Sequence, residues 1–149
     1  MMHQAVSAVA YMHRSGYMHR DIKPENFLIN DDGKLKLADF GLAKQTKGNL
    51  ADTLTEYVST RWYRAPEIAL RSRSYNQAVD VFALGCIMGE MYLGRPLFPG
   101  RTEQDQLMTI VSVMGTPSQS EWPEGHRLMQ QSGRKFANIT ISSLDESLR

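Results

Sequence analysis

The chain has 149 residues, a net charge of +1, 42% hydrophobic residues and 22% charged residues, which is ordinary for a soluble domain with its own core. This balance gives no electrostatic reason to expect nucleic acid or an anionic membrane as a partner. A single cysteine, Cys86, excludes an internal disulfide framework and favours a reducing compartment. Without a signal peptide or an apolar run of ~20 residues, we expect an intracellular monomer in the cytoplasm, the nucleus or both.

The first predicted element is an amphipathic helix. Met2, Val6, Val9 and His13 recur at helical spacing and form one face. Gly16 is the expected C-cap of this helix. No capping residue precedes the pattern, so we expect the helix to begin upstream of the sequence. We interpret His13 as a core histidine without a functional role.

Two short strands are predicted next, over 27–29 and 34–37, with turn residues between them at 30–33. Together they predict a β-hairpin. Residues 42–64 then read as a long polar loop, and loops of this length are uncommon unless they have a function.

A second helix is predicted over 79–93, where Asp80 and Glu90 are the charged residues. Because such a helix is apolar on nearly every face, we expect it to be buried all round. Pro96 and Pro99 are expected to end it.

Thr102 caps a further amphipathic helix. Its expected apolar positions include Leu107, Ile110, Val111 and Met114. After residues 115–117 the periodic pattern weakens, and residues 142–149 are expected to open another helix.

Three short motifs occur in order between these elements. They are His19-Arg20-Asp21-Ile22-Lys23-Pro24-Glu25-Asn26, Asp39-Phe40-Gly41 and Ala65-Pro66-Glu67. This ordered set resembles the catalytic core of a eukaryotic serine/threonine protein kinase. The glycine-rich loop and strand lysine that open the family pattern have no counterpart in this sequence, so the resemblance implies a partial kinase domain.

The run 58–67, Val-Ser-Thr-Arg-Trp-Tyr-Arg-Ala-Pro-Glu, narrows the resemblance to the CMGC group of kinases, which contains the mitogen-activated and cyclin-dependent kinases. Residues 95–100, 105–107 and 115–117 match the same group. The run 55–64 together with residues 120–125 is most similar to the male germ cell-associated kinases. Glu56 departs from that pattern and is typical of the extracellular-signal-regulated kinases instead.

The resemblance implies a mainly α fold, the C-terminal lobe of the protein kinase fold, with a small β-hairpin that carries the metal-binding motif. The N-terminal lobe and the last helices of the domain are expected to be absent from residues 1–149. The implied parts are a catalytic loop at 19–26, an activation segment at 39–67, a buried helix at 78–93 and a CMGC-type segment at 95–125.

Phosphoryl transfer requires a protein to position the reactants and to neutralise charge more than to take part in covalent chemistry. By resemblance, Asp21 is the base that accepts the proton of a substrate hydroxyl, and Lys23 touches the transferring phosphate. Asn26 and Asp39 offer hard oxygen ligands for Mg²⁺, and the hairpin between them folds them toward one point. A turn residue is the alternative interpretation of Asp21 and of Asn26.

ATP and Mg²⁺ are therefore the implied cofactors. Thr60 joins Asp21 and Lys23 in the implied catalytic set. The residues implied to contact the nucleotide are Lys23, Glu25, Asn26, Leu28 and Asp39.

The resemblance also implies regulation by phosphate. Thr55 and Tyr57 are the implied activation-loop phosphorylation sites, since a phosphate adds roughly −1.5 to −2 charge and can order a loop that faces arginines. Arg20, Arg61 and Arg64 are the implied phosphate-reading residues, and Arg61 and Arg64 also help to shape a proline-accepting pocket.

Five residues are given structural roles by the resemblance: His19, Phe40, Gly41, Glu67 and Asp80. Asp80 is expected to hydrogen-bond the backbone near His19 and so anchor the catalytic loop. Gly41 is expected to permit a backbone bend beside a packed Phe40. Glu67 pairs with an arginine in the family, and no residue of this sequence matches that partner.

These observations favour an ATP-dependent serine/threonine kinase that is proline-directed. Residues 1–149 are expected to be a fragment of it, with little or no turnover of their own. The implied partners are proteins with Ser/Thr-Pro sites and an upstream activating kinase. The alternative is a non-catalytic lobe fragment or pseudokinase that acts as a protein-binding module.

Overall fold

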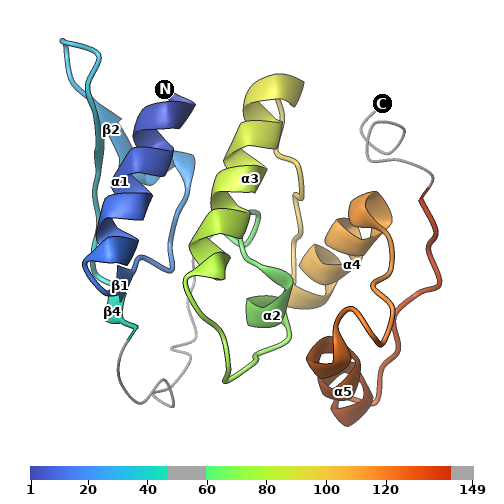
Figure 1. The fold of residues 1–149 in the computed structure, drawn as a ribbon. Helices are drawn as coiled ribbons and strands as arrows, with labels where there is room; N and C mark the ends of the chain where they lie inside the picture. Colours follow the sequence, from blue (N-terminus) through green and yellow to red (C-terminus); the bar gives the residue numbers. More distant parts are fainter. Residues whose placement is uncertain (47–59, 142–149) are drawn as a thin grey trace.

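The computed structural model describes residues 1–46 and 60–141, and within them the fold is mostly helical, as predicted (Figure 1). The helices are α1 Met2–Arg14, α2 Pro66–Ala69, α3 Ala78–Leu93, α4 Glu103–Met114 and α5 Pro123–Gln131, with a 3₁₀ turn at Pro24–Asn26. The strands are β1 Tyr17–Met18, β2 Phe27–Ile29, β3 Leu35–Leu37 and β4 Lys44–Gln45. None of the helices in these two ranges is long and apolar enough to cross a membrane.

Helix α1 lies between the hairpin and α3, and it supports both (Figure 1). Its buried side chains are Ala5, Val9 and Met12. The helix ends at Arg14, as predicted, but its C-cap is Ser15 rather than Gly16, which follows with a left-handed φ of 82°. On the hairpin side, the Gln4 side chain accepts a hydrogen bond from Leu35 N at 2.8 Å and donates one to Gly33 O.

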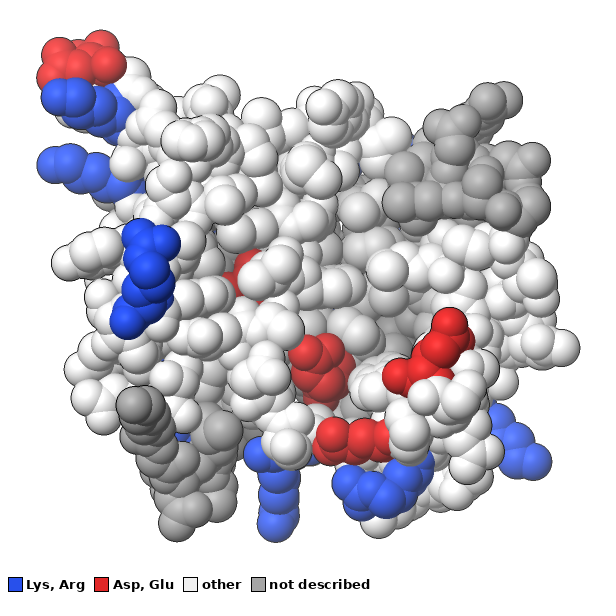
Figure 2. Space-filling view, in the orientation of Figure 1, with Lys and Arg blue, Asp and Glu red and all other residues white. Residues whose placement is uncertain are grey.

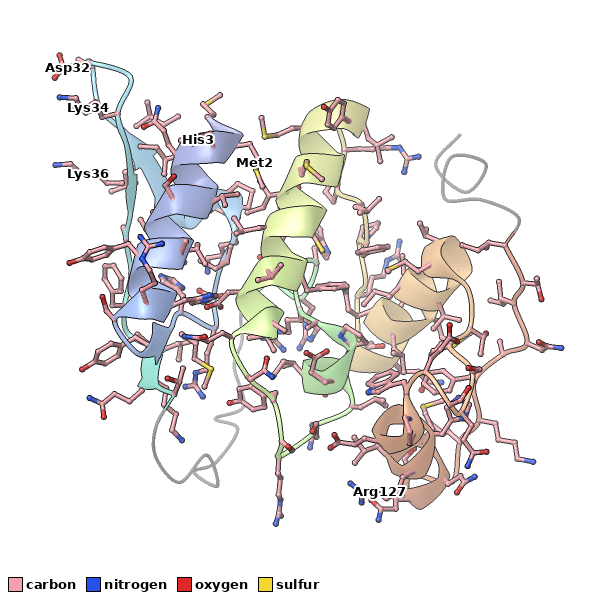
Figure 3. All side chains as sticks on the ribbon, viewed as in Figure 1. Met2, His3, Asp32, Lys34, Lys36 and Arg127 are labelled. Carbon is pink, nitrogen blue, oxygen red and sulfur yellow. The ribbon has the colours of Figure 1, made fainter. Side chains whose placement is uncertain are left out.

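The predicted β-hairpin is confirmed. Strands β2 and β3 pair antiparallel with Phe27 opposite Leu37, and Gly33 N donates to Asn30 O at 2.9 Å in the turn. Asp32 and Lys34 extend from the tip of this hairpin, away from the helices (Figure 3).

A second strand pair, β1 with β4, was not predicted. Tyr17 lies opposite Gln45, so the expectation of a loop from residue 42 onward is wrong at Lys44–Gln45. Strands of two residues are too short to carry a period-2 pattern, which is why no signal in the sequence marks them.

Helix α3 is the central helix, but it is not buried all round, and that expectation is wrong. Asp80, Ala83 and Cys86 are buried, whereas one side exposes a run of large apolar residues: Val81, Met88, Met91 and Tyr92. An apolar composition shows that a helix face can be buried, but it does not show that another described element covers that face. Figure 2 shows few charged side chains over this helix.

The end of α3 also differs from the expectation. Gly94 adopts a left-handed φ of 67° and its N–H donates to Glu90 O at 2.8 Å, so the helix ends before Pro96 and Pro99 are reached. Pro96 and Pro99 follow in the irregular segment that leads to α4.

Helix α4 begins as predicted, because the Thr102 hydroxyl accepts a hydrogen bond from Asp105 N at 3.1 Å. Leu107, Ile110 and Val111 are buried, but Met114 is 53% exposed and the prediction for it is wrong. Helices α2 and α5 were not predicted, since four and nine residues give a weak periodic signal. The helix expected over 142–149 lies outside the described residues.

Candidate active site

The loop 19–26 is anchored by the carboxylate of Asp80, a residue of α3 that is 1% exposed. Oδ2 accepts a hydrogen bond from His19 N and Oδ1 accepts one from Arg20 N, each at 2.8 Å. These are the contacts that the sequence led us to expect. Since Arg20 has a left-handed φ of 70°, the two bonds hold a strained turn in place.

His13 completes this anchor, although the sequence interpretation assigned it no role. Its Nε2 lies 2.8 Å from Asp80 Oδ2, across 67 residues of sequence. The available signal was the position of His13 on the apolar face of α1, where a polar side chain needs a partner.

Asp21 is held by two neighbours on the same loop. Its Oδ2 accepts a hydrogen bond from Lys23 Nζ at 2.7 Å and lies 3.3 Å from Asn26 Nδ2. Asn26 Nδ2 also donates to the Asp21 carbonyl at 2.7 Å. The structure therefore brings together three of the predicted site residues and fixes the Asp21 carboxylate in one orientation.

Asp39 reaches the same region through the hairpin. Ala38 N donates to the Asn26 carbonyl at 2.8 Å, so the residue after Ala38 lies beside the end of the 3₁₀ turn. Gly41 lies in a turn, in which Ala43 N donates to Phe40 O at 2.9 Å, whereas the residue with a left-handed conformation is Asp39, with a φ of 58°. Gly41 matters differently: its N–H donates to Asp39 Oδ1 at 3.3 Å, and a Cβ there would lie 3.2 Å from that oxygen.

Phe40 and His19 form the neighbouring contact. The rings meet edge to face with centroids 5.4 Å apart, and His19 Nε2 lies 2.9 Å from Ala38 O. His19 is fully buried, whereas Phe40 remains 54% exposed and is only partly packed.

The donor set fits Mg²⁺. The Asn26 side-chain nitrogen donates to Asp21, so its side-chain oxygen Oδ1 is the atom that this residue can offer to a cation, and Asp39 offers a carboxylate. Within 1–46 and 60–141 no three His, Cys, Asp or Glu residues gather into a metal site. Two protein oxygens completed by water and phosphate oxygens are the usual environment of Mg²⁺.

A cleft opens beside Asp21, between the loop 19–26, residues 60–65, α2 and the first turn of α3; we call it the Asp21 cleft. The charged residues that line it are Arg20, Asp21, Arg64, Arg71, Asp80 and Glu103, and Thr60, Tyr63 and Tyr75 add hydroxyl groups. Thr60 and Asp21 thus line the same cleft. Leu28 and Glu25 lie elsewhere, and Leu28 is 57% exposed on the hairpin.

The three predicted phosphate-reading arginines have different environments. Arg20 donates to the Leu42 carbonyl at 2.7 Å and to the Tyr75 hydroxyl at 2.9 Å. Arg64 pairs with Glu103 at 3.5 Å. Arg61 Nε is buried and lacks a hydrogen-bond partner in the described part of the chain. Thr55, Glu56 and Tyr57 lie outside the described residues.

Cys86 is a packing residue on α3, as expected. Burial raises the pKa of its thiol to about 12, so it stays protonated and unreactive at neutral pH.

Glu67, at the start of α2, is a half-buried carboxylate near Glu124. Burial raises the pKa of Glu67 above its ordinary value of 4.5, and the charge of Glu124 raises this pKa further. No lysine or arginine in the two described ranges forms an ion pair with it. The charged form of Glu67 therefore destabilises this fold.

We expect Glu67→Gln to stabilise the 149-residue chain at neutral pH. The folded state binds the Glu67 proton more tightly than the unfolded state, so the wild-type free energy of unfolding falls as pH rises from about 4.5 through the raised pKa. The free energy of unfolding of Glu67→Gln does not fall in this way. The difference in stability between the variant and the wild type therefore grows from near zero at about pH 4 to a plateau above the raised pKa. Urea unfolding across this range measures it.

Glu121 provides a control of opposite sign. Ser118 N donates to its carboxylate at 2.8 Å and lowers its pKa, so Glu121→Gln should lose stability above the ordinary pKa of a glutamate. If the free energy of unfolding depended on pH in the same way in Glu67→Gln and in the wild type, the charge of Glu67 would be balanced by another group in solution.

The geometry agrees with the comparisons to known proteins. The family model for the protein kinase domain matches residues 1–147. Cyclin-dependent kinase F-3 of Oryza sativa subsp. japonica is 48% identical over 145 residues, which cover 97% of this chain and 33% of that protein. Serine/threonine-protein kinase MAK of Homo sapiens is 47% identical over 136 residues, 91% of this chain and 22% of that protein.

A third relative, serine/threonine-protein kinase ICK of Rattus norvegicus, is 49% identical over 128 residues, 86% of this chain and 20% of that protein. The chain thus spans about a fifth to a third of the length of these relatives. They are cyclin-dependent, MAK and ICK kinases, which confirms the predicted CMGC resemblance. With nearly its whole length matched by the family model, the chain belongs to the protein kinase domain family.

Proposed function

We propose that this chain is the lower, mainly helical lobe of an ATP-dependent protein serine/threonine kinase that is proline-directed. The observation that supports it best is the Asp21 carboxylate, held by Lys23 and Asn26 at the edge of a cleft that Thr60 also lines. In this proposal the loop 19–26 is the catalytic loop, 39–67 the activation segment and 95–125 the CMGC-type segment.

Asp21 takes the proton from the hydroxyl of a substrate serine or threonine as that oxygen bonds to the γ-phosphorus of ATP, while the bond from this phosphorus to the β–γ bridging oxygen breaks and ADP leaves. Lys23 already pairs with Asp21, at 2.7 Å, and its ammonium can also face the phosphate whose charge develops during transfer. Thr60 lies along the same cleft and helps to hold the hydroxyl. The anchor made by Asp80 and His13 keeps this loop in place before the substrate arrives.

Asn26 and Asp39 would hold Mg²⁺, and Lys23, Glu25 and Leu28 would lie along the nucleotide. Mg²⁺, when bound, neutralises phosphate charge and orients the γ-phosphate. This chain contributes oxygen ligands, while Leu28 offers an exposed apolar surface for the nucleotide on the hairpin.

Activation is proposed to follow phosphorylation of Thr55 and Tyr57 by an upstream kinase. A phosphate would compete for Arg20, which now binds Leu42 O and Tyr75. The buried Nε of Arg61, which has no acceptor in the described ranges, suits a second phosphate because an unsatisfied buried donor is costly until an acceptor arrives.

The test is a transfer assay with the complete kinase that contains this chain. Two peptides that differ only in Ser-Pro against Ser-Ala are compared, with phosphorylation of Thr55 and Tyr57 followed by mass spectrometry. We expect the Ser-Pro peptide to be favoured at least about tenfold in kcat/KM. A complete, doubly phosphorylated protein that modifies neither peptide would favour the protein-binding module instead.

A further inference from the structure

Gln106, in α4, has a polar side chain that is fully buried. Its Oε1 accepts a hydrogen bond from Gly100 N at 3.1 Å, and its Nε2 donates one to the Trp62 carbonyl at 3.3 Å. The second bond joins residues that are 44 positions apart in the sequence. Because a buried amide is costly unless its polar atoms are bonded, this side chain makes a specific link between two distant segments.

The segment at the other end of this link turns at Trp62. Arg64 N donates to Arg61 O at 2.9 Å and so closes a turn over residues 61–64. The Trp62 carbonyl takes no part in that bond, so it needs a donor from outside the turn. Gln106 supplies this donor from α4.

The same turn forms one wall of the Asp21 cleft. The residues of this wall that line the cleft lie on both sides of Trp62 in the sequence: Thr60, Tyr63, Arg64 and Ala65. Trp62 and Gln106 are not among the described lining residues, so their bond holds the wall from behind. Two residues of an extended chain span at most about 7 Å, so a shift of Trp62 also moves Thr60.

Tyr63, the next residue of the turn, is held by a different helix. It is buried, and its hydroxyl donates to Glu90 Oε2 in α3 at 2.7 Å. Burial and the neighbouring Glu90 raise the pKa of Tyr63, so the hydroxyl keeps its proton and remains a donor. Two successive residues of the turn are thus fixed to α4 and to α3, and loss of either contact leaves the turn fixed at one of these two points.

Gly100, the other partner of Gln106, has a second acceptor. Its N–H also donates to Phe98 O at 2.9 Å. A Cβ on Gly100 would lie 2.4 Å from Gln106 Cα, so glycine is required for the close approach of this backbone to α4. A variant without the Gln106 amide therefore leaves Gly100 N with a partner and removes the donor from the Trp62 carbonyl.

We propose that Gln106 is a positioning residue for the protein substrate. Its buried amide fixes the turn 61–64, and thereby holds Thr60 at the distance from Asp21 that a bound substrate hydroxyl requires. This inference rests on the proposed function of the Asp21 cleft. It gives a role in the reaction to a residue of α4 that touches neither the substrate nor the nucleotide.

Two variants remove the N–H group that the Trp62 carbonyl accepts. Gln106→Met keeps an unbranched side chain of similar length and buries no charge, so it is expected to fold. Gln106→Glu keeps an oxygen that can accept from Gly100 N but places its other oxygen against the Trp62 carbonyl. The loss that both variants share is the bond to Trp62. Gln130→Glu makes the same chemical change at an exposed position of α5 and is the control.

The experiment uses the complete, phosphorylated kinase that contains this chain and one Ser-Pro peptide. Peptide KM and kcat are measured at saturating ATP, and the Kd for ATP with Mg²⁺ is measured by calorimetry. We expect peptide KM to rise about tenfold in both Gln106 variants, because a displaced wall holds the substrate hydroxyl less well. The Kd for ATP should stay within about twofold of the wild-type value, since the proposed nucleotide ligands are positioned through the hairpin. Gln130→Glu should match the wild type in all three quantities.

The outcomes separate this proposal from the proposed function. A wild type that phosphorylates no peptide contradicts the kinase function itself. An active wild type with an unchanged peptide KM in Gln106→Met overturns the role of Gln106. A Kd for ATP that weakens in parallel with peptide KM, or failure of both variants to fold, also overturns it, because each would show that Gln106 supports the whole fold and not the substrate wall.

Discussion

Replacing Asp80 by asparagine will destabilise the chain by about 3–5 kcal/mol, the usual cost of removing one partner from a buried charged network. The carboxylate accepts hydrogen bonds from His19 N and Arg20 N through different oxygens, both at 2.8 Å. An amide presents one oxygen and one NH₂ group, so one backbone N–H would face another donor in a site that is 1% exposed. His13 Nε2 would lose its anionic partner as well.

The measurement is urea unfolding followed by circular dichroism. Folded domains are stable by about 5–15 kcal/mol, so a loss of this size moves the midpoint far down or leaves the chain unfolded in water. Asp32→Asn is the matched control, since Asp32 lies exposed at the hairpin tip and should change stability by less than about 0.5 kcal/mol (Figure 3). A midpoint for Asp80→Asn equal to that of the control would contradict the anchor.

His13→Ala offers a test of the same network from the other side. Because His13 and Asp80 are in contact, their substitutions should not add: the double variant should lose less stability than the sum of the two single variants. This coupling distinguishes a working contact from two independent packing positions.

The sequence predicted the parts of this fold that carry a periodic pattern or a turn signal. Helix α1, the hairpin with its Gly33 turn and the Thr102 cap each follow from local residue chemistry. Asp80 was placed correctly by resemblance to a family, since no local pattern says that a helix-terminal aspartate accepts hydrogen bonds from residues about 60 positions away.

What could not be predicted depends on partners far apart in the sequence. His13 is separated from Asp80 by 67 residues, and Glu103 from Arg64 by 39. The exposed side of α3 is the reverse case, because Met88 and Tyr92 have the composition of buried residues without a described neighbour to bury them. Asp39, rather than Gly41, takes the left-handed conformation, since an aspartate tolerates that region where its side chain can bond the local backbone.

Asp21→Asn in the complete kinase should lower kcat for peptide phosphorylation by about 10²–10⁴-fold while leaving nucleotide affinity unchanged. The amide cannot accept the hydroxyl proton, so the loss belongs to the transfer step. Its oxygen still accepts a hydrogen bond from Lys23 or Asn26, which keeps the loop in shape. Asn26 and Asp39, which are proposed to hold Mg²⁺ and the nucleotide, are untouched.

The two readouts are measured separately: kcat at saturating ATP by phosphate transfer, and the Kd for ATP with Mg²⁺ by calorimetry, with Asp32→Asn as the control for both. A Kd that weakens in parallel with kcat would mean that Asp21 supports the structure of the nucleotide site, the role of a turn aspartate. An unchanged kcat would remove Asp21 as the base altogether. Only a fall in kcat at constant Kd identifies Asp21 as the group that accepts the hydroxyl proton. Nucleotide binding depends on oxygens that the substitution leaves in place, whereas transfer depends on the carboxylate that it removes.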